Sequence, residues 1–136
     1  MFVDRLRPDQ RQVLYDIAVM LAEVDNDVSI EELDYLKDFS EAYEVSSKLE
    51  PIADDRLDDA LRLFDTYSSK VILLQELIKL SYKDGHFDKS EQDKVLLIAQ
   101  KIGLNDPDLI LRIESWVREG VNWLYEGEAL LEPKSN

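Results

Sequence analysis

Two acidic turns contain the side chains whose types and spacing could do chemistry. The turn Asp-Asn-Asp-Val-Ser-Ile-Glu-Glu at 25–32 places oxygen-bearing side chains at every second position, then a carboxylate one helical turn later. A second turn, at 84–91, carries the same kind of side chains. Hard cations such as Ca²⁺ and Mg²⁺ prefer oxygen ligands of this kind. The candidate metal ligands are Asp25, Asp27, Glu32, Asp84, Asp88 and Glu91.

Neither turn is an EF-hand loop. That loop needs glycine at its sixth position and glutamate at its twelfth. Counted from Asp25, these positions hold Ile30 and Leu36. Counted from Asp84, they hold lysine and valine. An EF-hand is therefore excluded at both turns.

The same residues also have a purely structural explanation. Ser29 followed by Glu32 forms a capping box at the start of a helix, and Asp88 followed by Glu91 forms a second one. Aspartate and asparagine favour turns, and the helix macrodipole favours negative charge at a helix N-terminus. A glutamate used in a cap has less freedom to bind a metal. Cation-binding turns and turns that serve only as helix caps therefore both remain open.

Other chemistry finds little support in the sequence. The chain has no cysteine, which excludes disulfides and thiolate metal sites. His86 is the single histidine, so a di-iron bundle, which needs two Glu-x-x-His motifs, is excluded. We expect His86 to be an exposed turn residue. No nucleophile, phosphate loop or basic substrate clamp accompanies the paired carboxylates, so we expect a protein that is not an enzyme.

The charge of the chain limits its partners. Thirty acidic residues against sixteen basic ones give a formal net charge of -14, which repels phosphate backbones and anionic lipid headgroups. We expect no nucleic-acid partner. No apolar run approaches the roughly 18 residues of a membrane span, so we expect no membrane insertion. The polar stretch 1–12 does not resemble a secretory signal, and a cytoplasmic location follows as the expectation.

Apolar spacing predicts helices along the whole chain. A stripe from Val13 to Val24, with Pro8 near its start, predicts the first helix, and the cap at Ser29 begins a second one that ends near Tyr43. The second helix should carry Leu33, Leu36, Phe39 and Tyr43 inward. A connector at 45–59 leads to a short amphipathic helix with Leu57, Ala60, Leu61 and Phe64 on one face.

The second half of the chain continues the helical pattern. A helix at about 70–83, capped by Ser68 or Ser69, is apolar on several faces and should be central. The helix that begins at Asp88 carries Val95, Leu96, Ile98, Ala99 and Ile102 and ends at Gly103. Asp106 and Pro107 begin the last helix, which runs to about Glu126.

No segment alternates with a period of two, so the sequence predicts an all-α fold. We expect one compact bundle of about six to seven helices over residues 1–126, followed by a disordered tail at 127–136.

An internal duplication is visible when the chain is shifted against itself by about 59 positions. Asp25 then meets Asp84, and the two caps and their glutamates coincide. The shared turn chemistry, more than the shared apolar spacing, indicates a true repeat. The predicted units are 13–45 and 71–104.

These turns resemble those of the TerB-like tellurite-resistance family. The family signature, Asp-Gly-x-(apolar)-x-x-x-Glu after an apolar helix, reads here as residues 84–91 and again as 25–32, where Asn26 replaces the usual glycine. The resemblance covers most of residues 10–126. It implies a compact, all-helical, cytoplasmic bacterial domain associated with stress and tellurite resistance. It also implies divalent-metal binding by Asp25, Glu32, Asp84 and Glu91.

The two tryptophans of the chain are expected in different environments. Trp116 lies on the apolar stripe of the last helix and should belong to the core, whereas Trp123 is the better candidate for a partner site. The expected function is that of a non-catalytic TerB-like domain that binds a divalent cation weakly and acts through a protein partner. The alternative is a protein-interaction module without metal. The oligomeric state stays open.

Overall fold

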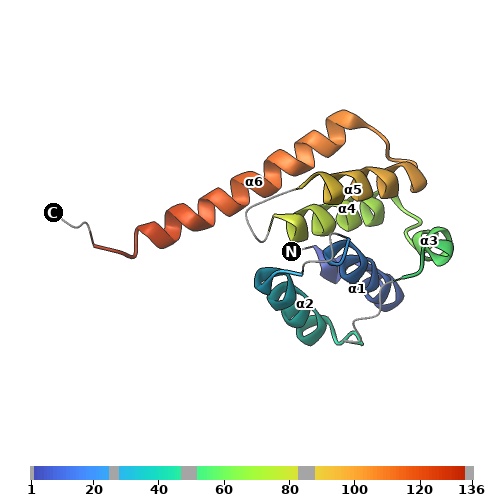
Figure 1. Ribbon diagram of the computed structural model, residues 1–136, viewed down its shortest axis with the longest axis horizontal. Coiled ribbons are helices and arrows are strands. Elements are labelled where there is room, and N and C mark those ends of the chain that lie inside the picture. Colours follow the sequence, from blue (N-terminus) through green and yellow to red (C-terminus); the bar gives the residue numbers. More distant parts are fainter. Residues whose placement is uncertain (1, 25–27, 47–51, 83–87, 134–136) are drawn as a thin grey trace.

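Six α-helices build the described part of the computed structural model, which covers residues 2–24, 28–46, 52–82 and 88–133 (Figure 1). These stretches contain no strand, so the predicted all-α bundle is confirmed. A short 3₁₀ turn, Val3–Arg5, precedes the helices. The helices are α1 (Pro8–Ala22), α2 (Ile30–Tyr43), α3 (Asp54–Leu61), α4 (Tyr67–Ser81), α5 (Lys89–Lys101) and α6 (Pro107–Ala129).

Helix α4 is the centre of the bundle, as predicted. It packs against α1, α2, α5 and α6, and its leucines are almost completely buried. Its start differs from the prediction, because Thr66 is the N-cap in place of Ser68 or Ser69. The Thr66 hydroxyl accepts a hydrogen bond from the Ser69 amide, and the Ser69 hydroxyl accepts one from the Thr66 amide. This reciprocal pair starts α4 at Tyr67, three residues before the predicted position.

Several helix bounds follow the 59-position shift of the predicted internal duplication. A shift of 59 positions carries both ends of α1 onto both ends of α4, and it carries the start of α2 onto the start of α5. Helix α1 contacts α2, α4 and α5, and α4 contacts α5, α1 and α2. Exchanging the two repeats therefore leaves this set of helix contacts unchanged, as expected for two units related by a pseudo-twofold axis.

The buried faces of α2 and α5 are narrower than predicted. In α2, Glu32, Leu36 and Phe39 form the buried stripe, and Tyr43 is half-buried. Leu33 lies about 100° around the helix from Glu32 and is 43% exposed, so its predicted inward position was wrong. Leu96 of α5 is likewise exposed. Residues that follow the 3.6-residue period of the helix are buried, whether their side chains are charged or apolar.

Helix α3 begins inside the predicted connector. The apolar face of this short helix is confirmed, with Leu57, Leu61 and Phe64 buried and Ala60 half-buried. Asp54 and Asp55 form its first turn, where negative charge is favourable.

Helix α6 is held to the bundle by its first half alone. Ile110, Ile113 and Val117 are buried, and α6 contacts α4. Beyond Val117 every described residue is exposed except the half-buried Val121, and this half projects away from the other helices (Figure 1). The helix ends at Ala129, so 127–129 form its last turn and do not belong to a disordered tail, while 134–136 lie outside the described residues. None of the helices in the described stretches is long and apolar enough to cross a membrane.

Trp116 does not belong to the core, contrary to the prediction. It is 37% exposed, and its ring stacks on Phe2 with 6.2 Å between the ring centroids. The apolar stripe of α6 that faces α4 runs through Ile113 and Val117, and Trp116 lies beside it. The ring therefore covers the N-terminal segment at the edge of the bundle.

Tyr82, at the end of α4, is joined to α6 by a hydrogen bond that should make stability depend on pH. Its hydroxyl donates to Glu114 Oε1 over 2.8 Å, and burial together with this bond raises the pKa of Tyr82 to about 12. A raised tyrosine pKa means that the folded state favours the neutral phenol. This contribution to stability is complete below pH 10, the ordinary pKa, and is lost as pH rises toward 12.

We therefore expect Tyr82→Phe to lose less stability than wild type between pH 10 and 12. Urea unfolding at a series of pH values measures the difference. Parallel stability curves for the two proteins would contradict the prediction. Tyr67, which is 65% exposed, supplies the matched control as Tyr67→Phe.

Candidate functional site

The predicted metal ligands fall into two groups in the structure. Asp25, Asp27 and Asp84 lie outside the described residues, as does His86. Glu32, Asp88 and Glu91 are described, and they lie at the starts of α2 and α5. These three carboxylates are therefore the predicted ligands whose contacts and burial the structure describes.

The described carboxylates take part in helix capping. The Ser29 hydroxyl accepts from the Glu32 amide, and Glu32 Oε1 accepts from the Ser29 amide, each over 3.1 Å. The capping box predicted at Ser29 is thus confirmed. At α5, Asp88 Oδ1 accepts from the Glu91 amide over 3.0 Å and from the Ser90 hydroxyl over 2.8 Å. The predicted N-cap at Asp88 is also confirmed.

Both glutamates are buried, which their role in a surface cap does not require. Glu32 is 4% exposed and Glu91 is 3% exposed, although most glutamates in proteins lie in solvent. Burial of a carboxylate is costly unless hydrogen bonds or a positive charge compensate it. The two repeats therefore place a buried carboxylate at the same position, directly after each acidic turn.

The described residues alone do not form a metal site. Within the described stretches, no group of three or more histidine, cysteine, aspartate or glutamate side chains could hold an ion. A cation bound at either turn would need oxygens from Asp25 and Asp27, or from Asp84, in addition to Glu32 or Glu91. The first turn offers more carboxylates for this than the second.

A third buried glutamate, which the sequence analysis did not single out, links α2 to α4. Glu76 is 4% exposed; its Oε2 accepts from the Tyr35 hydroxyl over 3.2 Å and lies 3.5 Å from Lys79 Nζ. Burial, followed by the nearby Glu76, raises the pKa of Tyr35 well above its ordinary value, so the phenol stays a neutral donor. The sequence signal was a glutamate, next to Gln75, within the mostly apolar stretch 71–80 of α4.

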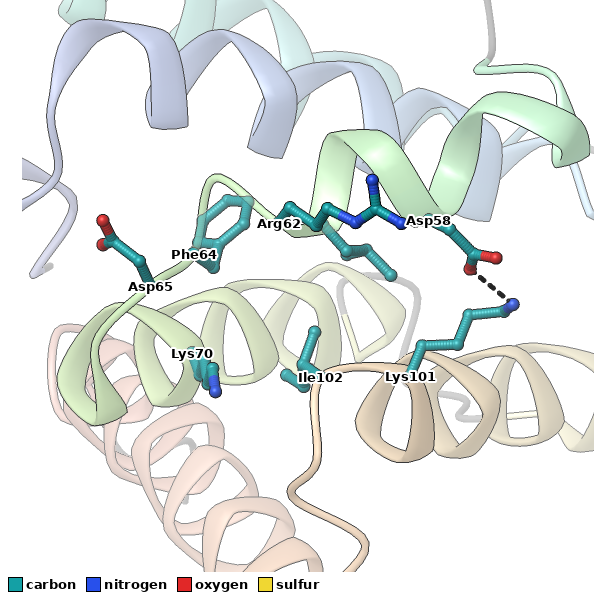
Figure 2. Close-up of a pocket in the computed structure, with 8 residues that line it drawn as sticks. Asp58, Arg62, Phe64, Asp65, Lys70, Lys101 and Ile102 are labelled. Carbon is teal, nitrogen blue, oxygen red and sulfur yellow. Dashed lines mark hydrogen bonds and ion pairs between the residues drawn. The ribbon is translucent and has the colours of Figure 1, made fainter.

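A surface cavity of about 550 Å³ lies between α3, the start of α4 and the end of α5 (Figure 2). Asp58 and Lys101 form an ion pair across it, with 2.6 Å between Nζ and Oδ1. Arg62, Asp65 and Lys70 add both signs of charge to its rim, and Phe64 and Ile102 form part of its wall. Among the described residues that line it, there is no serine, threonine, histidine or cysteine to act as a nucleophile or proton carrier at neutral pH.

The cavity was not predicted because its wall comes from segments far apart in the chain. The Asp58–Lys101 pair and a second pair, Lys94 with Asp54 at 3.4 Å, both join α5 to α3. Exposed pairs of this kind contribute at most about 1 kcal/mol each. The cavity is therefore best explained as a gap along the contact between α3 and α5.

No family model, no curated protein and no solved structure matches the chain. The resemblance to the TerB-like family therefore rests on the two acidic turns and on the helices between which they lie.

Proposed function

We propose that this protein is a non-catalytic, TerB-like helical module that binds a divalent cation weakly at its acidic turns and acts through a protein partner. The observation that carries the cation part is the pair of buried glutamates, Glu32 and Glu91, at equivalent positions after the two turns. Glu32 Oε1 accepts a hydrogen bond from the Ser29 amide, and each oxygen of a carboxylate has more than one lone pair, so a capping carboxylate can also bind a cation. Ca²⁺ and Mg²⁺ are the cations whose ligand preferences fit.

The partner part of the proposal is supported by the surface of α6. Trp123 is 72% exposed, and Leu124 and Tyr125 are each 59% exposed. Large aromatic and aliphatic side chains gathered on one exposed helix are typical of protein contact surfaces. The net charge of -14 adds a general attraction for cations and for basic protein surfaces.

The alternative is an interaction module in which the turns serve only as caps. The hydrogen bonds of Ser29 with Glu32, and of Asp88 with the Glu91 amide, favour it directly. Under this alternative the protein still acts in the cytoplasm during tellurite or other stress, and it still contacts a protein partner. The difference lies in whether a cation has any effect.

Isothermal titration of the chelator-treated protein with Ca²⁺, Mg²⁺, Mn²⁺ and Zn²⁺ tests the proposal at physiological salt. We expect saturable binding that is lost in the double variant Asp25→Asn/Asp84→Asn, because both turns lose a charged oxygen ligand. The variant Asp108→Asn/Asp106→Asn is the matched control, since it removes the same charge from the start of α6. Diffuse binding that both variants weaken alike would leave the turns as caps and overturn the cation part.

A further inference from the structure

The packing stripe of α6 continues into the half of the helix that has nothing to pack against. Ile110, Ile113 and Val117 face α4, and the same 3–4 spacing continues through Gly120, Leu124 and Gly127 to Leu131. A second row, seven residues apart, runs from Leu109 and Trp116 to Trp123 and Leu130. We call the continuation, made of Gly120, Trp123, Leu124, Gly127, Leu130 and Leu131, the free seam. It follows directly on the contact between α6 and α4. The part from Gly120 to Gly127 lies on the projecting half of the helix, and Leu130 and Leu131 follow its last residue, Ala129 (Figure 1).

The free seam is large and exposed. Trp123 is 72% exposed, Leu124 59%, Leu130 84% and Leu131 82%. Helical hydrogen bonding continues past Ala129 in tighter form, because the Leu131 amide donates to the Glu128 carbonyl over 3.0 Å. A tryptophan buries about 200 Å² and a leucine less, so two copies of the seam would cover at most on the order of 1,000 Å², the lower limit of a specific interface.

We propose that the free seam pairs with the free seam of a second copy of this chain in an antiparallel helix dimer. With a twofold axis between Tyr125 and Glu126, Leu124 of one copy lies level with Gly127 of the other, and Leu131 lies level with Gly120. These two leucines thus meet glycines, where the helices can approach closely, whereas Leu130 lies level with Val121. A Cβ added at Gly120 or Gly127 would meet no atom of its own chain, so the fold of one copy gives no steric reason for glycine there.

One pair of opposite charges beside the seam fits the same register. Arg118 of one copy lies within one residue of level with Glu132 of the other, on the same side of the pair, and the twofold axis generates this contact twice. Of the net charge of -14 on each copy, the paired stretch 118–132 carries -3, from four glutamates and one arginine, and the rest lies outside it. The paired stretch is roughly 20 Å long at 1.5 Å per residue, and the two bundles lie at its opposite ends. That separation exceeds the Debye length of about 8 Å at physiological salt.

This inference rests on the proposed action through a protein partner, and it names that partner as a second copy. Sedimentation equilibrium of the full chain, from low to high micromolar concentration, tests it. We expect a mass that rises reversibly from one chain to two. A mass of one chain throughout would overturn the pairing, while the cation titration would still decide the proposed function separately.

Variants at exposed positions keep the test independent of folding. Leu124→Ser should raise the dissociation constant of the dimer by more than about tenfold. Each copy contributes one Leu124, so the substitution removes a leucine from two symmetry-related contacts at once. Leu111→Ser is the matched control: Leu111 is also 59% exposed and also on α6, but it lies off the seam, so dimerisation should be unchanged. Equal effects of the two substitutions would overturn the proposal.

Two further variants test the register. Gly127→Leu should raise the helix content of the single chain and yet weaken the dimer, since it fills the space that Leu124 of the other copy occupies. Arg118→Glu should weaken the dimer, and Arg118→Glu/Glu132→Arg should restore it. A dimer that tolerates Gly127→Leu would show that the seam is not the interface.

Discussion

Leu77→Ala should lower the free energy of unfolding by about 3 kcal/mol, and the thermal midpoint by roughly 10 °C. Leu77 lies in the middle of α4 and is 0% exposed. Four helices surround α4, so the space left by the missing side chain cannot collapse from one side without disturbing packing on another. The loss combines the lost transfer free energy of the removed carbon atoms with the cost of the cavity that remains.

Urea unfolding followed by circular dichroism measures this difference. Leu111→Ala is the control, because Leu111 is 59% exposed on α6 and its truncation should change the free energy of unfolding by less than about 1 kcal/mol. Similar losses for the two variants would mean that α4 is not the centre of the bundle. The measurement belongs at low protein concentration, where any association contributes least.

Leu14→Ala and Leu73→Ala should each cost about 3 kcal/mol, and the two losses should agree within about 1 kcal/mol. The two leucines occupy equivalent positions of α1 and α4, and each is 0% exposed. If the repeats are related by a pseudo-twofold axis, each leucine loses a similar set of neighbours when it is truncated. The comparison therefore tests the duplication through energetics and not through sequence.

Chemical unfolding of the two variants side by side provides the measurement. Leu21→Ala and Leu80→Ala serve as the second equivalent pair, since the shift of 59 positions carries Leu21 onto Leu80 and both leucines are 0% exposed. Matched losses are expected there as well. A large loss at Leu73 beside a negligible one at Leu14 would show that the two repeats carry unequal shares of the core.

The sequence predicted most of the helices because local signals determine them. The Ser29 capping box, the Asp88 N-cap and the Asp106-Pro107 start of α6 were all found from residue type and spacing, and all three are confirmed. Gly103 at the end of α5 has a φ of 79°, which suits the glycine expected there. Caps are reliable signals because their hydrogen bonds join residues two or three positions apart.

Tertiary features were harder to predict. The start of α4 at Thr66 was missed because Ser68 and Ser69 offered competing caps, and the prediction did not weigh Ser69 as the capping-box partner of Thr66. Leu33 and Trp116 were placed in the core because apolar spacing does not show which flank of a stripe meets a neighbouring helix. A helical wheel gives the direction of a side chain and does not give what lies opposite it.

The candidate site was predicted less completely than the fold. Of its residues, Glu32 and Asp88 were recognised both as possible ligands and as caps, and the structure shows their capping contacts. The burial of Glu32 and Glu91 could not be read from the sequence, because charged residues are ordinarily assigned to the surface. Glu76 was overlooked for the same reason, although its place in a mostly apolar stretch was a usable signal.

Because only its first half is packed against α4, helix α6 acts as a lever. Its first half is fixed against α4, and about twelve further residues extend the rigid rod by roughly 18 Å at 1.5 Å per residue. A tilt of only about 10° at the anchored half would then sweep the far end through roughly 3 Å, by the same geometry. The hydrogen bond between Tyr82 and Glu114 joins the anchored half of α6 to the end of α4. In the sequence, Tyr82 lies shortly before the second acidic turn. Small changes in the packing of α6 on α4 are thus magnified at the far end of the helix.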